Sequence, residues 1–244
     1  MHPPRFVHLR LHSEYSITDG MVRLDVGKNH DCPPVNVAAA DGMPALALTD
    51  LGNLFGLVKF YDAARKKGVK PIVGADVWIA NPEAPEDPFR MLLLVKNHTG
   101  YRQLCELLTR AYLQPDRRDK AELHREWFSD VGCDGLIVLS GARQGDVGEA
   151  LAAGNGKLAK KRAEVWSKLF PGTYYLEVQR YGQPQQEAQV QAMAGLAGEL
   201  GLPLVATHPI QFMAREDFQA HEARVCIAEG YVLGDTRRPR AFTE

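Results

Sequence analysis

The sequence has little cysteine, no long apolar run and almost no net charge, and each absence excludes a class of protein. Its cysteines, Cys32, Cys105, Cys133 and Cys226, form no C-x-x-C pair. A zinc ribbon or a disulfide framework is therefore disfavoured, and free thiols in a reducing cytosol are expected. No apolar segment approaches the roughly 20 residues needed to span a bilayer, and the first residues lack a signal-peptide pattern. We expect a cytoplasmic protein without a membrane partner.

The charge balance says more about partners than about fold. Lys and Arg number 29 against 30 Asp and Glu, so the chain has no strong basic field with which to grip a phosphate backbone. We therefore expect no direct nucleic-acid binding. The chain has 244 residues, of which 45% are hydrophobic and 24% charged. These are ordinary values for a soluble globular protein with a sizeable core.

Short apolar runs alternate with segments of helical spacing. The runs are short and nearly continuous, which is typical of strands buried on both faces. Strand and helix patterns in alternation predict an α/β protein with a parallel sheet, closed as a barrel. An open doubly wound sheet is the alternative. The expected strands are residues 6–9, Ala45–Leu48, 72–73, 91–95, Leu136–Leu139, 174–178 and 204–206.

The expected helices cover residues 54–67, 100–113 and 185–200, the last of which ends at Gly201 before Pro203. We expect a single domain of residues 1–244, in which residues 218–244 form a helix and a tail that lead toward a further part of a longer protein. Residues 117–124 and the arginines of residues 237–240 are interpreted as solvated connections.

In an α/β barrel the reactive groups lie at the carboxyl ends of the strands. The residues there that could bind a divalent metal are His12, Asp19, Asp50 and Asp76, with His8 and His208 as weaker candidates. His8, Arg10 and His12 share one face if this segment is a strand. A permanent cation between two histidines is unusual for a metal site.

These residues lie in segments that resemble a known family. The segments are H-L-R-L-H-S-E-Y-S-I-T-D-G, M-P-A-L-A-L-T-D-L-G-N-L-F-G-L-V-K-F-Y, K-P-I-V-G-A-D-V, G-L-I-V-L-S-G-A-R-Q-G-D-V-G and F-P-G-T-Y-Y-L-E-V-Q-R-Y-G. They are similar to the polymerase and histidinol phosphatase (PHP) domain, in the version found at the N-terminus of bacterial DNA polymerase III alpha subunits. The similarity covers essentially the whole chain. It implies a distorted (β/α)7 barrel. One departure is residues 21–34, where Gly27, Pro33 and Pro34 would break the family's helix.

The resemblance also implies where a metal site would lie. His12 and Asp19 match the family's ligands, and Asp76 stands where the family has Glu. The other ligand positions are lost, and Pro and Leu cannot coordinate a metal. We therefore expect no catalytic residue, no bound metal and no cofactor. The vestigial metal-site positions are Arg10, His12, Asp19, Leu51, Asp76, Arg90, Ala142, Pro209 and Gln211.

Two of the lost positions carry arginine, while two acids remain. A buried carboxylate without its metal is costly unless it is paired. We therefore expect Arg10 or Arg90, or both, to pair with Asp19 or Asp76. We interpret His12 and Asp19 as hydrogen-bonded residues of the rim. Asp50 is interpreted as a helix N-cap or turn residue, and His208 as a turn residue before Pro209.

By resemblance, the chain is a non-catalytic scaffold for the polymerase core of a longer polypeptide, which would be a DNA-directed DNA polymerase. It would also dock the separate proofreading exonuclease subunit. The alternative is a metal-dependent phosphoesterase or 3′–5′ exonuclease with a divergent site. A third hypothesis, metal-independent pyrophosphate hydrolysis, lacks a positioned general base and a phosphate clamp.

Overall fold

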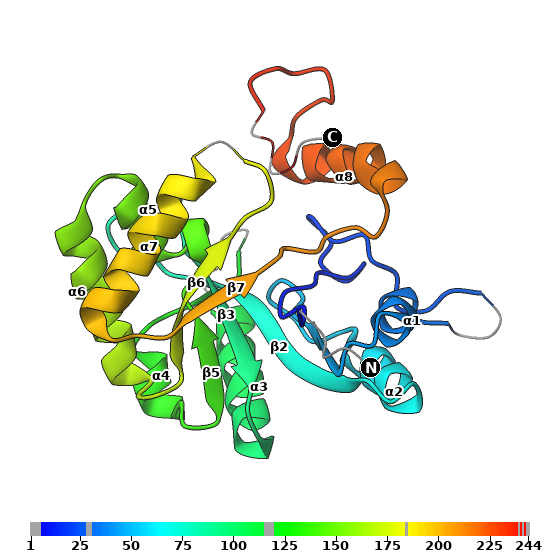
Figure 1. Ribbon diagram of the computed structural model, residues 1–244, viewed down its shortest axis with the longest axis horizontal. Helices are drawn as coiled ribbons and strands as arrows, with labels where there is room; N and C mark the ends of the chain where they lie inside the picture. The colour runs from blue at the N-terminus through cyan, green and yellow to red at the C-terminus, as the bar shows by residue number, and fades with distance from the viewer. Residues whose placement is uncertain are drawn as a thin grey trace. The chain divides into compact units, whose positions relative to one another are not determined.

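A computed structural model describes residues 6–27, 31–114, 120–183, 185–238, 240 and 242. The chain divides into two compact units (Figure 1). Unit 1 comprises residues 1–73, 181–183 and 208–244, and unit 2 comprises residues 74–180 and 184–207. The division falls inside one strand, β2 (Lys70–Ile79).

Unit 1 is built around a segment that was expected to be the first strand. Residues 6–10 form no regular strand, which corrects that expectation, because only isolated backbone bonds hold them. The amide of Ala47 donates to the His8 carbonyl, and Leu11 bridges to Ile210 in parallel. Residues 10–13 are all buried.

The helices of unit 1 enclose one apolar core, formed by Leu11, Val22, Leu24, Cys32, Val35, Leu46, Leu48, Phe60, Ala64 and Val69. Pro33 and Pro34 begin a helix, because the first turn needs no backbone N–H donor. The break that we expected in residues 21–34 is therefore a helix start. Residues 28–30 of that segment lie outside the described residues. The elements are α1 (Pro33–Ala40), β1 (Ala45–Leu48), α2 (Leu57–Lys66), the first part of β2, η2 (Arg215–Asp217) and α8 (Phe218–Glu229).

Unit 2 contains the remaining strands and helices. Trp166, Phe128 and Phe170 pack against one another in its interior, with ring centroids 5.3–6.2 Å apart. The elements are β3 (Phe89–Val95), α3 (His98–Leu113), β4 (Glu122–Leu123), α4 (Trp127–Val131), β5 (Leu136–Leu139), η1 (Ala142–Gln144), α5 (Asp146–Ala152), α6 (Gly156–Leu169), β6 (Tyr174–Gln179), α7 (Gln186–Leu200) and β7 (Leu204–Thr207).

The sheet is mixed, which confirms the α/β class and corrects the expectation of a parallel sheet. β1 pairs with β2, β5 with β6, and β6 with β7 in parallel, whereas β3 is antiparallel to both β2 and β5. The connection of residues 80–88 contains no helix, and only antiparallel neighbours can be joined by so short a loop. Asn81 shapes this loop by donating to the Asp87 carbonyl and accepting from the Glu83 amide.

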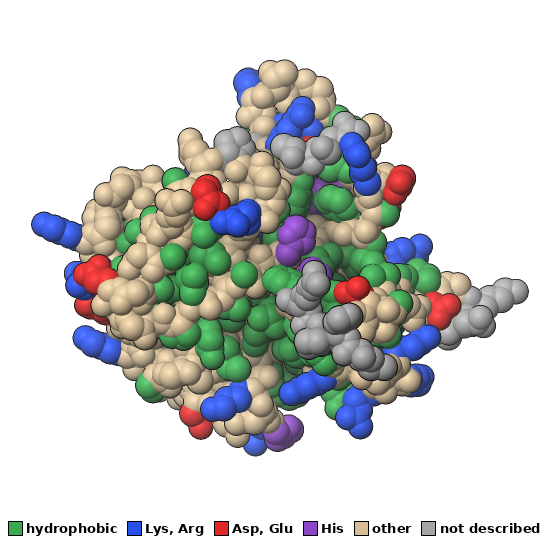
Figure 2. Space-filling view, in the orientation of Figure 1, with side chains coloured by type: hydrophobic (Ala, Val, Ile, Leu, Met, Phe, Trp, Pro, Cys, Tyr) green, Lys and Arg blue, Asp and Glu red, His purple; other side chains and the backbone are tan. Residues whose placement is uncertain are grey.

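Two segments that were interpreted as solvated are partly buried. Glu122 and Leu123 form β4 beside β2, and Leu123 is fully buried. Residues 115–119, in the first part of the charge-rich segment, lie outside the described residues. In the tail, Arg238 is 8% exposed and its guanidinium pairs with Glu222. Arg237 is exposed, as expected, and pairs with Asp235 at 2.8 Å. Figure 2 shows charged side chains of both signs on the surface.

Candidate functional site: two groups of former ligand positions

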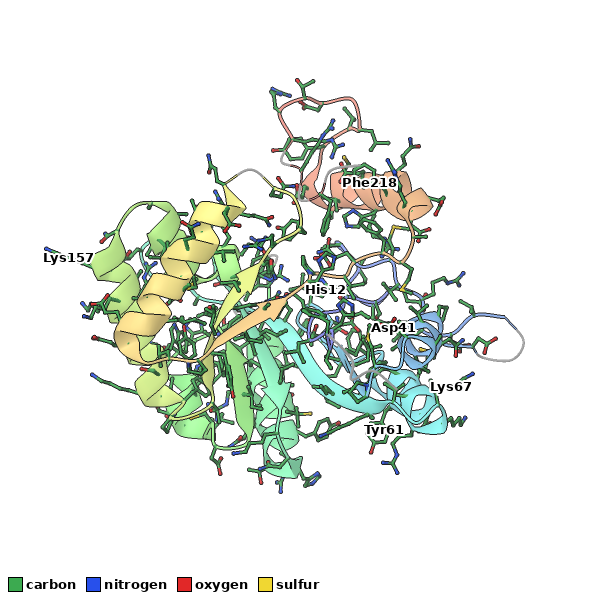
Figure 3. The ribbon with its side chains drawn as sticks, viewed as in Figure 1. His12, Asp41, Tyr61, Lys67, Lys157 and Phe218 are labelled. Carbon is green, nitrogen blue, oxygen red and sulfur yellow. The ribbon has the colours of Figure 1, made fainter. Side chains whose placement is uncertain are left out.

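The expected site positions fall into two groups, one in each unit. Unit 1 holds Arg10, His12, Asp19, Leu51, Pro209 and Gln211, and unit 2 holds Asp76, Arg90 and Ala142. Figure 3 shows His12 among the side chains of the opening segment. Each group has its own set of hydrogen bonds.

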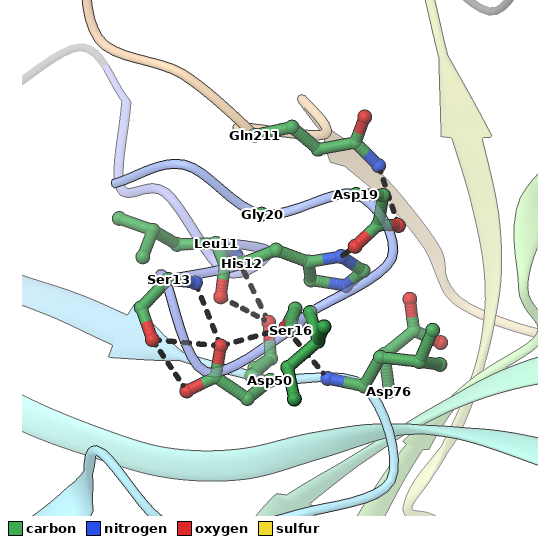
Figure 4. A network of polar contacts seen from close by, with 12 residues as sticks. Leu11, His12, Ser13, Ser16, Asp19, Gly20, Asp50, Asp76 and Gln211 are labelled. Carbon is green, nitrogen blue, oxygen red and sulfur yellow. Dashed lines mark hydrogen bonds and ion pairs between the residues drawn. The ribbon is translucent and has the colours of Figure 1, made fainter. Parts of the chain in front are cut away.

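In unit 1, Asp19 accepts hydrogen bonds from two side chains (Figure 4). Its Oδ1 lies 2.8 Å from Nδ1 of His12, and its Oδ2 accepts from Nε2 of Gln211 at 2.9 Å. His12 is 2% exposed. Because Asp19 accepts at Oδ1, His12 carries its proton on Nδ1. His12 and Asp19 are hydrogen-bonded to each other, as expected, and their place on a barrel rim stays a prediction.

The same chain of hydrogen bonds continues into α8. Oε1 of Gln211 lies 2.9 Å from Nε2 of His221, a fully buried residue. Burial lowers the pKa of His221, although Glu222 and Asp19 act in the opposite direction. A neutral His221 that donates from Nε2 matches an amide oxygen as acceptor. Glu222, the next residue, pairs with Arg238. Side-chain hydrogen bonds thus connect the opening segment to α8, whose Glu222 holds the tail.

Asp50 has a role that the sequence interpretation missed. Its carboxylate accepts from the Ser13 amide at 2.6 Å and from the Ser16 hydroxyl at 2.7 Å. The expected N-cap role is wrong, because α2 begins at Leu57 with Gly56 as its N-cap. Burial raises the pKa of Asp50, and the bonds from Ser16 and Ser13 oppose that rise. Ser16 also accepts from the Leu51 amide at 2.9 Å. Asp50 therefore fixes the turn of residues 13–16 against β1.

In unit 2, Arg90 pairs with Asp76. Nε of Arg90 donates to Oδ1 of Asp76 at 3.2 Å, and Nη2 donates to Oδ2 at 2.5 Å. The guanidinium lies over the ring of Trp78, 4.5 Å from its centroid. The Asp76 side chain is fully buried and that of Arg90 is 7% exposed. The expectation that an arginine pairs with a retained acid is confirmed for Arg90. For Arg10, which is 4% exposed, such a pairing stays a prediction.

Ala142 lies in a tightly constrained turn after β5. Gly141 has φ +79°, and a Cβ placed there would lie 2.0 Å from the carbonyl oxygen of Arg90. Ala142 follows with φ +49° and is buried. The Gly141 amide donates to Glu177 at 3.0 Å, and Glu177 also accepts from the Thr207 hydroxyl. Sequence reasoning missed Glu177, because it is a single polar residue inside the expected strand of residues 174–178.

Among the residues that the structure describes, no three His, Cys, Asp or Glu side chains gather as a metal site would require. In the same part of the chain, no helix is both long and apolar enough to cross a bilayer. The retained acids Asp19 and Asp76 each use both carboxylate oxygens on protein donors.

The family model of the PHP domain matches residues 8–181. The chain belongs to the PHP domain family. The expected resemblance to the PHP region of polymerase alpha subunits is also confirmed. The chain is 52% identical over 245 residues to DNA polymerase III subunit alpha of Neisseria meningitidis serogroup A. It is 42% identical over 243 residues to the subunit of that name from Escherichia coli K12. The matched region is N-terminal in these subunits.

The PHP chain spans about a fifth of the length of these relatives, 21% and 20% respectively, although each match covers 100% of the chain itself. Among solved structures, it is similar to an amidohydrolase from Chromobacterium violaceum, solved with bound sulfate and no metal. The TM-score is 0.51 at 13% identity, and the match covers 89% of this chain and 96% of that one. This likeness concerns the fold alone.

Proposed function

We propose that the chain is the N-terminal PHP portion of a replicative DNA polymerase III alpha subunit whose metal site is degenerate. In this proposal it is a structural scaffold for the polymerase core of the same longer polypeptide, which performs DNA-directed DNA synthesis in the cytoplasm. It also docks the proofreading exonuclease subunit. The chain itself needs no metal or cofactor and performs no hydrolysis.

The contacts of the retained acids, Asp19 and Asp76, support the proposal that the metal site is degenerate. A multi-metal centre needs several deprotonated ligands that point at open coordination positions. Asp76 instead accepts two charge-assisted bonds from the guanidinium of Arg90. Both carboxylate oxygens of Asp19 are likewise occupied by the side chains of His12 and Gln211. The residues present therefore do not fit a metal cluster.

Metal content tests this part of the proposal. The purified chain is incubated with zinc or manganese, dialysed, and assayed for bound metal and for hydrolysis of a generic phosphoester. We expect substoichiometric metal and no turnover above the background of the His12→Ala variant. Stoichiometric, tightly bound metal, or turnover that His12→Ala abolishes, would instead support the alternative of a metal-dependent phosphoesterase or exonuclease.

Docking of the exonuclease is tested separately by titration. The exonuclease subunit from the same organism is titrated into the chain, beside a version of that subunit lacking its C-terminal tail. Saturable binding that depends on the tail is the expected result. Undetectable binding at high micromolar concentration would remove the docking role and leave support of the polymerase core alone.

A further inference from the structure

Helix α2 and the turn before it expose large apolar and aromatic side chains that the core of unit 1 does not use. Phe55 is 69% exposed, Val58 72% and Tyr61 44%, and the three are spaced three residues apart. The inner side of the helix is already occupied, because Phe60 and Ala64 are fully buried in the core. A phenylalanine exposed to this extent contributes little to the stability of the isolated fold.

Exposed cations follow directly in the chain. Arg65, Lys66, Lys67 and Lys70 are all exposed. In the part of the chain that the structure describes, the ion pair formed by α2 joins Lys59 to Asp25 at 3.4 Å, and none joins these four cations. Figure 2 shows Lys and Arg side chains at the lower right, where α2 lies, and Figure 3 labels Tyr61 and Lys67 there. We call Phe55, Val58, Tyr61, Arg65, Lys66, Lys67 and Lys70 together the α2 surface.

Helix capping explains only part of this pattern. Arg65 and Lys66 lie in the last turn of α2, where cations favour the negative end of the helix dipole. The same interaction extends to Lys67, the C-cap residue of α2, but it leaves Lys70 unexplained and says nothing about the exposed rings of Phe55 and Tyr61.

Comparison with α6 shows that lysines on this protein can have acidic neighbours. Lys160 of α6 binds Glu199 at 2.6 Å, and Glu164 lies within the same helix. Helix α2 also contains an acid, Asp62, three and four residues before Arg65 and Lys66, whereas the segment from Arg65 to Lys70 contains none. The near-zero net charge of the whole chain therefore conceals a local excess of positive charge at α2.

We infer that the α2 surface binds single-stranded nucleic acid, with the four cations on phosphates and the rings of Phe55 and Tyr61 stacked on bases. Cations beside exposed aromatic side chains are the combination that holds single strands without sequence preference, because phosphates need charge and every base offers a stacking face. A purely acidic protein segment such as polyglutamate would use the cations but would leave the rings without a matching partner. This inference does not depend on the scaffold function.

Salt-dependent binding of the whole chain to a labelled oligothymidylate tests the inference. Four phosphate contacts on a single strand predict a slope of log affinity against log salt of about −2.8. Affinity should therefore fall about 50-fold when the salt concentration rises fourfold. The Lys66→Glu/Lys67→Glu variant should lose at least about tenfold in affinity and flatten the slope. The matched control is Lys157→Glu/Lys168→Glu, which makes the same change of net charge at exposed lysines of α6.

Tyr61 distinguishes stacking from charge alone. Tyr61→Ala should weaken binding to the single strand about tenfold and leave binding to a duplex unchanged, whereas Tyr61→Phe should restore it. Thermal melts followed by circular dichroism check each fold, and Lys66→Gln/Lys67→Gln replaces the charge reversal if that variant unfolds. Equal losses in the α6 control would overturn the inference. Equally effective competition by polyglutamate would also overturn it, in favour of an acidic protein partner.

Discussion

Arg90 and Asp76 lie on neighbouring antiparallel strands and form a two-pronged ion pair on one face of the sheet. Arg90 is opposite Trp78 in the β2–β3 register, and Asp76 is two residues before Trp78 on β2. The guanidinium therefore reaches the carboxylate diagonally and lies over the Trp78 ring on the way. Because both charges are buried, each depends on the other for its solvation.

Removing Arg90 alone should destabilise unit 2 strongly. Arg90→Met leaves the buried Asp76 carboxylate without a counter-charge, and we expect the free energy of unfolding to fall by about 3–5 kcal/mol. Tryptophan fluorescence during urea unfolding measures this change, because Trp78, Trp127 and Trp166 all lie in unit 2.

Two further variants show whether the charge or the side chain is responsible. Arg90→Met/Asp76→Leu removes both charges and should recover most of the loss. Arg110→Met breaks an exposed pair with Glu106 and should change the free energy of unfolding by less than about 1 kcal/mol. If the double variant is no more stable than Arg90→Met, the ion pair is not the cause of the loss.

Gln211 should hold α8 to the opening segment. Gln211→Leu removes the donor to Asp19 and the acceptor for His221, and we expect a loss of about 1–3 kcal/mol. Amide hydrogen exchange should rise in Phe218–Glu229 and stay unchanged in Gly156–Leu169. Gln191→Leu, which removes a weak 3.5 Å contact with Glu187, is the control. Unchanged exchange in α8 would show that its apolar contacts suffice.

Gly141 should tolerate no side chain. In Gly141→Ala the new Cβ meets the Arg90 carbonyl oxygen at 2.0 Å, in addition to the cost of φ +79°. Gly154 has φ +73° with nothing within 4 Å, so Gly154→Ala measures the backbone cost alone, about 1 kcal/mol. We expect Gly141→Ala to be at least about 2 kcal/mol worse than this control. Equal melting temperatures for the two variants would contradict the close approach.

Acid should weaken unit 1 through His8 and His208. Burial lowers the pKa of both histidines, and His208 lowers that of His8 further. In the unfolded chain each histidine has its ordinary pKa of 6.5, so it takes up a proton at higher pH than in the folded chain. The free energy of unfolding should therefore fall as the pH drops below 6.5.

The His8→Gln/His208→Gln variant isolates this contribution. Burial raises the pKa of Asp50 and of Asp146, so these carboxyls act in the opposite sense at lower pH, and they are common to both proteins. The variant should show a flatter loss of stability than the parent between about pH 7 and pH 5. Parallel profiles would show that the two histidines do not carry the effect.

The local patterns of the sequence predicted several of the regular elements, although residues 6–9 form no strand and β4 lies in a segment that was interpreted as a solvated connection. The helices at Leu57–Lys66, His98–Leu113 and Gln186–Leu200 followed from apolar spacing and from the stop at Gly201. The opening segment was mistaken for a strand because its apolar residues resemble one, although its hydrogen bonds come from β1 and from Ile210, far away in the chain. Sequence spacing alone does not reveal partners at that distance.

The site positions were predicted by resemblance, but their contacts required coordinates. The pairing of Arg90 with Asp76 could be expected from charge, since a buried acid needs a partner. The expectation that Asp50 caps a helix is wrong, because its hydrogen-bond donors are Ser13 and Ser16. These residues lie more than 30 positions away in the chain, so local spacing could not reveal them. His221 and Arg238 gave no local signal, because their partners Gln211 and Glu222 lie in ordinary polar surroundings.

The discontinuity of unit 1 has a consequence for synthesis on the ribosome. Residues 74–207, which include all of unit 2, are made before Ile210 and Gln211. Leu11 therefore lacks its bridge partner Ile210, and Asp19 lacks the donor Gln211, at a stage when unit 2 can already fold. The opening segment is therefore made before unit 2 but is among the last parts of this chain to reach its final partners.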